Sequence, residues 1–404
     1  MKRTVEFAFV FLLSIPVAAQ NLFEVIPGAD GSQLAKSALG FSEPGAPVDR
    51  RIAVHESALF ANEFVIQLDG VTHIALPEGE TELRSGGDFR RVFRLADAVQ
   101  PSFVTGHAGS YYGMVFLETG ETLEIRPDAQ GEILRQGGTP FRCEAVEAPP
   151  EIQLLGVYAE AQNTTGRRRA VAPWQRVIVP TVVLYTPAAL QSMGGDEQKV
   201  YVMAQGGVDA KNLANKNSLV TSRWQLAGIR LFQYNETGDG NVDLKAFAQS
   251  TDANQARRDL KASTAGLLTK EHRAIAYMPL GGKFTPAAGF YLVSIEGPEF
   301  SQAFAHESTH TEGAQHDIAN STPVPNDPYG FEFGWQFCNG PTPWITTMSY
   351  GTSCNLPPGQ NPAWLLQFSN PSVWIGGVPT GVEGKADNAK MIGIGAPRVA
   401  AYVP

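Results

Sequence analysis

The 404-residue sequence predicts a mostly β amino-terminal domain followed by an α/β carboxy-terminal domain. Residues 20–146 contain short alternating polar and apolar runs separated by glycine-rich turns, which is typical of strands. Residues 175–404 alternate β-branched apolar runs with stretches of helical periodicity, and this alternation implies a mixed α/β sheet. Between them, residues 147–174 are rich in Pro, Thr, Gly and Arg, so we expect a linker there.

The predicted elements follow in chain order. In the first half, the clearest strand patterns are residues 63–68, 91–95 and 114–117. In the second half we expect a strand from Val177, a helix from Gln198, a strand at 229–234, a helix at 254–263, a strand at 274–278 and an extended stretch at 290–295. Beyond Ala319 the many Pro, Gly and Asn residues indicate loops around a short terminal helix.

The amino terminus predicts export. Lys2 and Arg3 precede an apolar run at 7–17 that ends in small residues, as in a secretory signal peptide. That run is too short to span a bilayer, and no later stretch reaches the roughly 18 apolar residues that a transmembrane helix needs. We therefore expect residues 1–19 to be removed and the mature protein to be secreted or periplasmic.

Composition argues against a nucleic-acid partner. The formal net charge is −9, and no Lys/Arg stripe with interleaved aromatic residues occurs. The one basic cluster, three arginines at 167–169, is too short to follow a phosphate backbone and fits an exposed linker.

Residues 303–317 read AFAHESTHTEGAQHD and contain the complete pattern H-E-x-x-H-x-x-G-x-x-H. On a helix, each residue turns about 100°, so His306 and His310 lie about 40° apart and can direct their imidazoles at one point, with Glu307 beside them. His316 would be rotated about 120° away if the helix continued. We therefore expect the helix to end near Gly313, whose missing Cβ permits a left-handed turn that returns His316 to a shared metal.

Three neutral imidazoles suit Zn²⁺ and leave a fourth position for water, which is typical of a catalytic site. Glu307 would act as general base on a zinc-activated water, so the motif predicts hydrolysis of protein or peptide substrates. Two alternatives stay open. One is a secreted, non-enzymatic binding protein with a vestigial metal site, and the other is a zinc hydrolase for a non-peptide amide.

Met348 lies in the tight-turn context TTMSYG, 32 residues after His316, and looks like a Met-turn that supports the metal from beneath. Together, the histidine triad, this turn and the strand–helix–strand entry resemble the metzincin metallopeptidases over residues 175–404. Asp317 and the tail QFSNPSV at 367–373 are similar to the reprolysin-like (adamalysin-type) branch, including its bacterial secreted members. Thr311, Glu312 and Ser308 depart from that branch, which affects the expected substrate preference and helix packing rather than the ligands.

The resemblance implies a mixed, mostly parallel twisted sheet with a long active-site helix and a loop-rich carboxy-terminal subdomain. It also implies that substrate pairs in extended form with an edge strand ahead of that helix, and residues 289–295 are the candidate. Tyr350 resembles the tyrosine that assists zinc in astacin-like and serralysin-like members, so we consider it a transition-state stabiliser, with a packed aromatic as the alternative.

The chain contains three cysteines, so one must remain outside a disulfide in an exported protein. Cys338 and Cys354 are close in sequence and are the natural pair. Cys143 could then supply a fourth zinc ligand in a zymogen, with residues 20–146 as an inhibitory propeptide that is released by cleavage at the 167–169 arginines. The alternatives are a small buried hydrophobe for Cys143 and a permanent binding or folding module for the domain. The other histidines singled out by the sequence, His55, His73 and His107, lack ligand-like spacing and are expected to be structural or surface residues.

Overall fold

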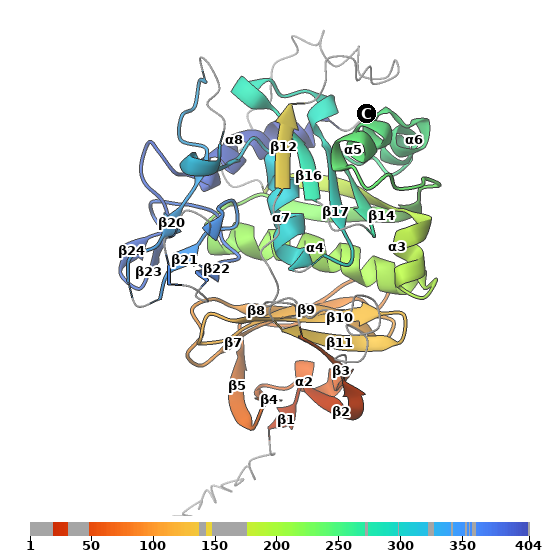
Figure 1. Cartoon of the computed structure of the whole chain (residues 1–404), viewed down its shortest axis with the longest axis vertical. Helices are drawn as coiled ribbons and strands as arrows, with labels where there is room; N and C mark the ends of the chain where they lie inside the picture. Colours follow the sequence, from red (N-terminus) through yellow and green to blue (C-terminus); the bar gives the residue numbers. More distant parts are fainter. Residues whose placement is uncertain are drawn as a thin grey trace, which may run out of the picture.

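A computed structural model of the chain describes residues 19–30, 48–136, 143–147, 176–270, 274–297, 299–321, 327–340, 342–351, 354, 356–357 and 361–402. The expected signal peptide and the arginines at 167–169 lie outside the described residues. Figure 1 shows two parts, a β-rich part that we call the β domain (residues 20–136) and a part with helices around a second sheet.

The β domain is built around one large sheet, as the alternating sequence predicts. Its strands pair in the order β1-β4-β5-β7-β8-β9-β10-β11-β3-β2, with β6 added to β7. They are β1 (Gln20–Asn21), β2 (Phe23–Asp30), β3 (Val48–Val54), β4 (Phe64–Leu68), β5 (Val71–Pro77), β6 (Glu82–Leu83), β7 (Phe89–Leu95), β8 (Ser102–His107), β9 (Ser110–Phe116), β10 (Thr122–Asp128) and β11 (Gly131–Gln136). A short helix, α2 (Glu56–Leu59), follows β3.

Strands β8 to β10 are buried on both faces. Because successive side chains of a strand point to opposite faces, Tyr111 packs in the core of the β domain while its neighbour Tyr112 packs in the core shared with the second part. Phe103 and Met114 join Tyr112 in that shared core. The two parts of the chain are therefore joined by a continuous apolar contact.

The second sheet is mixed and mostly parallel. Its strand order is β12-β16-β17-β15-β13-β14, and only the β16–β17 pairing within it is antiparallel. Its strands are β12 (Cys143–Glu147), β13 (Ile178–Tyr185), β14 (Arg223–Leu231), β15 (Thr264–Thr269), β16 (Ala274–Met278) and β17 (Phe290–Ser294). The helices of this part are α3 (Pro187–Ser192), α4 (Glu197–Asn217), α5 (Gly240–Gln249), α6 (Thr251–Asp259), α7 (Phe300–His310) and α8 (Asn388–Ala400). The expected mixed α/β architecture is confirmed.

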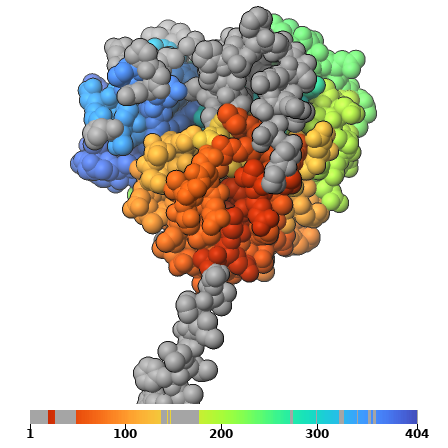
Figure 2. Space-filling model, turned by 60° about the horizontal axis from the view of Figure 1, so that its bottom comes forward, coloured from red at the N-terminus to blue at the C-terminus, as the bar shows by residue number. Residues whose placement is uncertain are grey.

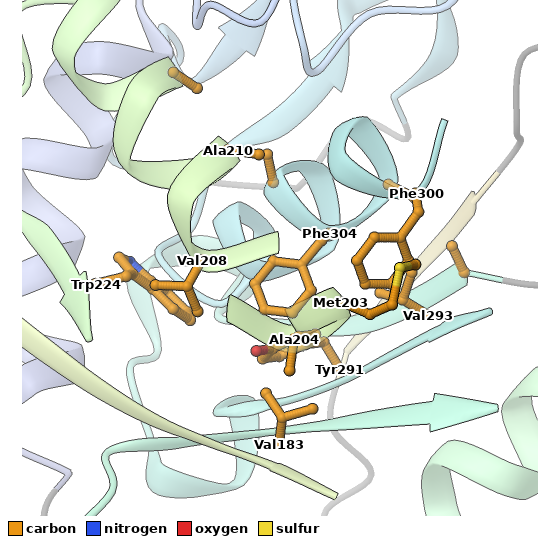
Figure 3. Packing of buried hydrophobic residues seen from close by; sticks show 14 of the residues in the cluster. Val183, Met203, Ala204, Val208, Ala210, Trp224, Tyr291, Val293, Phe300 and Phe304 are labelled. Carbon is orange, nitrogen blue, oxygen red and sulfur yellow. The ribbon is translucent and has the colours of Figure 1, made fainter. Parts of the chain in front are cut away.

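Helices cover both faces of this sheet. Val182 and Leu184 of β13 pack with the cluster that contains α5 and α6, whereas the alternate residues Val183 and Tyr185 pack with α4 and α7. Figure 3 shows the cluster that contains α4 and α7, in which Phe304 of α7 lies between α4 and β17. The predicted helix at 254–263 is α6, and it starts earlier because the Ser250 side chain accepts hydrogen bonds from the backbone N–H groups of Asp252 and Ala253.

The expectation that residues 289–295 form the edge strand is wrong. β17 lies inside the sheet, between β15 and β16. β16 would be the edge strand, but β12 pairs with it in parallel, from Cys143 opposite Ala274 to Glu147 opposite Met278. The last residues of the expected 20–146 domain thus belong to the second sheet. Hydrophobic periodicity identifies strands but not their spatial order, which explains the error.

The remaining chain is loop-rich with short pairings, as expected beyond Ala319. These are β18 (Gln315–Asp317) with β19 (Phe333–Gly334), β20 (Gln336–Phe337) with β21 (Trp344–Ile345) and β22 (Ala363–Trp364), and β23 (Trp374–Ile375) with β24 (Val378–Pro379). The described residues also form three 3₁₀ turns, η1 (Leu280–Gly282), η2 (Pro286–Ala288) and η3 (Ile318–Asn320). Among the helices of the described chain, none is both long and apolar enough to span a bilayer.

Candidate metal centre

The site is built on α7, which is buried along its whole length. Phe300 and Phe304 anchor the helix, and the Phe304 ring meets Tyr291 of β17 edge-on at a centroid distance of 5.4 Å. His306 and His310, one turn apart, direct their rings to a common point with centroids 4.8 Å apart. The apolar first turns of α7 therefore hold the helix in place, and the helix sets the positions of the two imidazoles.

The chain reverses directly after α7. Gly313 has φ +91°, the left-handed conformation that the motif predicts, and a Cβ at this position would lie 2.8 Å from Met391 Cε. This turn returns His316, whose Nε2 lies 3.0 Å from His310 Nε2. Glycine is favoured here by its backbone conformation, and a side chain would in addition displace the end of Met391.

Cys143 of β12 reaches the same point from the amino-terminal half. Its Sγ lies 3.2 Å from His306 Nε2, 3.4 Å from His310 Nε2 and 3.1 Å from His316 Nε2. One ligand atom from each of these four buried residues lies within 4.8 Å of the others. Three imidazole nitrogens and one sulfur suit tetrahedral binding of a transition metal such as zinc.

Two histidines are oriented by carbonyl groups. His306 Nδ1 lies 2.8 Å from the Thr347 carbonyl oxygen, and His310 Nδ1 lies 2.8 Å from that of Ala314. Donation from Nδ1 makes Nε2 of each ring the nitrogen that can bind a metal. Burial, followed by the neighbouring imidazoles, lowers the pKa of His306 and His310 well below the usual value, and burial lowers the pKa of His316 to about 4. All three imidazole rings are therefore uncharged at physiological pH, the form in which a histidine binds a metal.

Glu307 lies beside the ligands without an ordinary hydrogen-bond partner. Both its carboxylate oxygens are buried and unsatisfied among the described residues. Burial raises its pKa well above the usual value, and the Cys143 side chain opposes that rise. A buried carboxylate normally has a hydrogen-bond partner, so the position of Glu307 fits a site at which a polar ligand beside the metal would supply that partner.

The other residues expected in the site lie around it. Met348 is fully buried in a turn directly after Thr347, whose carbonyl orients His306. The Tyr350 hydroxyl lies 3.0 Å from His316 Nε2 and 3.2 Å from Cys143 Sγ. The Tyr350 backbone N–H donates to Asp317 at 2.9 Å, so the residue after the third histidine holds the tyrosine segment.

The remaining cysteines and histidines lie elsewhere. Cys338 and Cys354 form a disulfide, as expected from their spacing. The three histidines of the β domain have acidic neighbours and lie outside the metal-ligand cluster: His55 beside Glu24, His73 beside Glu118 and His107 beside Asp88.

Sequence reasoning missed a buried ion pair beneath the centre. Lys211 of α4 is fully buried and contacts Glu312 at 2.7 Å and Thr309 at 2.6 Å. Trp224 Nε1 donates to the other Glu312 oxygen at 3.0 Å. Glu312, one of the positions where the sequence departs from the reprolysin-like branch, was the available signal, because a carboxylate beside the buried motif requires a partner.

No family model matches the chain. Three relatives carry the name peptidyl-Asp metalloendopeptidase. One, from Stenotrophomonas maltophilia strain R551-3, is 28% identical over 53% of this chain and 50% of its own length. Another, from strain K279a, is 28% identical over 94% of both chains, and one from Xanthomonas campestris is 24% identical over 81% of this chain and 78% of its own. The chain thus spans about half the length of the first relative and nearly all of the second.

Among solved structures, one titled "Structure of a chaperone-substrate complex" aligns with a TM-score of 0.45 and 16% identity, over 73% of this chain and 39% of that chain. The sequence relatives, together with the cluster of Cys143 and three histidines, support a metal-dependent peptidase family for this chain.

Proposed function

We propose that this protein is an exported zinc endopeptidase of the reprolysin-like metzincin type, made as an inactive proenzyme. The observation that carries the proposal is the convergence of three histidine Nε2 atoms beside the buried, unsatisfied carboxylate of Glu307. Export rests on the signal-like first residues alone.

His306, His310 and His316 would hold the zinc. When bound, the metal supplies a water of lowered pKa and polarises the scissile carbonyl. Glu307 would act as the general base that takes the proton of the attacking water and returns it to the leaving amine. Tyr350 would donate from its hydroxyl to the developing oxyanion, because this hydroxyl lies beside the metal-binding nitrogen of His316, at 3.0 Å from Nε2.

Two features support inhibition in the intact chain. Cys143 Sγ takes the place beside the three histidines that a fourth ligand requires. β12 also pairs with β16, so the backbone groups with which an extended substrate would pair are used. We infer that β12 must leave before substrate binds, and that β16, rather than β17, is the strand that receives it.

Peptides that contain aspartate are the first substrates to test, because the relatives are named for peptidyl-Asp cleavage. The chain carries no Lys or Arg from residue 284 to 384, the stretch that includes α7, the third histidine and the Met348 turn. A pocket built from this stretch alone would bind a substrate carboxylate through neutral hydrogen-bond donors. We therefore expect a smaller Asp-over-Asn preference than a paired arginine would give.

The test uses the exported protein after limited proteolysis, with an unfolded protein such as reduced casein as substrate. Hydrolysis should stop with a zinc chelator, return with zinc and be reduced about 10²–10⁴-fold in Glu307→Gln. The full-length Cys143→Ala variant should stay inactive until it is processed, because β12 still pairs with β16, whereas activity before processing would show that the thiolate alone inhibits. Zinc-loaded, processed wild type that cleaves neither casein nor peptides would sink the proposal in favour of a binding protein with a vestigial site.

A further inference from the structure

Helix α4 lies between the two parts of the chain. It contacts β8, β9 and β10 on one side and α7 and β14 on the other, and Figure 1 shows it as the long helix directly above the β domain. Val202, Gly206, Asp209 and Leu213 recur at helical spacing and are all buried. Because α4 buries side chains on both sides, its stability depends on packing against both parts of the chain.

Tyr112 of β9 is fully buried in this contact. A Cβ on Gly206 would overlap its ring, so α4 has a gap in its side-chain surface where the ring sits. The ring also meets Phe300, the first residue of α7, edge-on at a centroid distance of 5.6 Å. Tyr112 thereby touches both the central helix and the active-site helix.

The Tyr112 hydroxyl caps α7. It accepts hydrogen bonds from the backbone N–H of Ser301 at 3.0 Å and from the Ser301 hydroxyl at 2.7 Å, and it donates to Glu124 at 2.6 Å. The residue before the helix, Glu299, has left-handed backbone and provides no side-chain cap. One of the N–H groups that every helix leaves unpaired at its start is therefore satisfied by the β domain.

Buried polar contacts reinforce the same interface. Asp209 of α4 is fully buried and receives Arg84 at 2.6 and 3.0 Å and the Thr105 hydroxyl at 2.7 Å, both from the β domain. Arg126, also buried, donates to the carbonyl groups of Ile295 and Gly297 just ahead of α7. Separation of the two parts would leave these groups without their partners.

The interface continues along the carboxy-terminal segment. Gln100 donates to the Trp364 carbonyl at 3.0 Å and accepts from the Leu366 N–H at 2.7 Å. In Figure 2 the orange and yellow surface of the β domain lies directly against the blue surface of that segment. The contact therefore extends from α4 and the start of α7 to the chain beyond the Met348 turn.

We propose that the β domain stays on the second part as a permanent subunit of the working enzyme, and that Tyr112 is a positioning residue for α7. This proposal rests on the proposed function, because only an active peptidase can be the working enzyme. The contacts that close the metal site belong to β12, whereas those that hold the β domain belong to residues 78–135. Activation then removes β12 from β16 and leaves the larger interface in place.

The first experiment separates association from catalysis. Trypsin, which cuts after arginine and lysine, is used to nick the intact chain, and the products are run on a sizing column under native conditions. We expect the two large fragments to elute together, with casein hydrolysis in that peak. Elution of the second part alone with undiminished activity per mole would overturn the proposal. If no fraction cleaves casein, the proposed function fails, but co-elution or separation, repeated with Glu307→Gln, still decides whether the domain is retained.

The second experiment tests the positioning role. Tyr112→Phe keeps the ring and removes the hydroxyl, so kcat should fall roughly two- to tenfold, the range for one hydrogen bond, with KM and bound zinc unchanged. Thr105→Val is the matched control, because it removes a buried hydroxyl from the same interface that reaches α4 instead of α7. Equal kcat values for the two variants would contradict the positioning role.

Gly206→Ala is a second test of the positioning role, and it changes no polar group. Alanine favours the helix, but its Cβ pushes against the Tyr112 ring, so kcat should again fall. A kcat that is unchanged or raised would count against the proposal.

Discussion

Replacing Lys211 by methionine should strongly destabilise the second part of the chain. The Lys211 and Glu312 side chains are both fully inaccessible to solvent, and their charged atoms lie 2.7 Å apart. Burial lowers the pKa of Lys211, and the Glu312 carboxylate opposes that fall, so each charge depends on the other. Methionine fills a similar volume but leaves the buried carboxylate with a neutral hydrogen-bond donor, Trp224, and without the lysine's positive charge.

The expected loss is about 3–5 kcal/mol, the range for removing one member of a buried ion pair. For a unit of this size, about 1 kcal/mol shifts the melting temperature by roughly 2–4 °C, so the midpoint should fall by roughly 6–20 °C. The Lys211 ammonium also lies 4.3 Å from the Phe368 ring centroid, an attraction that is lost as well. Because Glu312 immediately precedes the turn at Gly313, weaker metal retention should accompany the loss.

Thermal unfolding followed by circular dichroism measures the effect, and Lys216→Met on the same helix is the control. The Lys216 side chain is 62% exposed, so its replacement should change stability by less than about 0.5 kcal/mol. The double variant Lys211→Met with Glu312→Leu should recover most of the loss, since a well-packed apolar pair often matches a buried ion pair. A loss below about 1 kcal/mol in Lys211→Met, or a double variant worse than the single one, would refute the reasoning.

Three further predictions concern other parts of the fold. Gly313→Ala should reduce metal affinity measured by competition with a chelator, because the left-handed turn is strained by a side chain that would also press on Met391; unchanged affinity would mean that the turn does not set the position of the third histidine. Burial raises the pKa of Glu299 to about 8, so the folded state holds a proton that the unfolded chain releases near pH 4.5, and stability should decline as pH rises from about 4.5 to 8. Glu299→Gln should flatten that decline in urea titrations at pH 5 and 8, and an equal slope in both proteins would show that the carboxyl titrates normally. Reduction of Cys338–Cys354, which are 16 residues apart, should lower stability by about 3 kcal/mol in the same assay, and a midpoint unmoved by reductant would contradict the loop-entropy argument.

Local sequence patterns predicted the local structure around the site. The four-residue spacing of His306 and His310 requires no more than one helix, and the left-handed backbone of Gly313 follows from the need to bring back His316. The turn at Met348 and the disulfide were likewise visible in short stretches of sequence. In each case neighbours along the chain determine the geometry.

Contacts between distant segments were not predictable in the same way. The approach of Cys143 to the three histidines was considered because the cysteine count left it unpaired, but its entry as a strand beside β16 has no sequence signal. The cap that Tyr112 gives to α7 joins residues 189 positions apart, and nothing in the pattern of β9 distinguishes it from other aromatic residues. Periodicity likewise could not show that β17 is interior, because both interior and covered edge strands are apolar.

The adjacent glycines of α4 have a consequence for folding cooperativity. A side chain on Gly206 would overlap Tyr112 of the β domain, and one on Gly207 would overlap Phe304 of α7. Each glycine in a helix interior lowers its intrinsic stability by about 1 kcal/mol relative to alanine, so α4 depends on packing against both parts of the chain for its helical state. Each half of the chain therefore needs the other to complete its packing around α4. Heating the intact protein should accordingly melt the β domain and the metal-binding half in a single calorimetric transition.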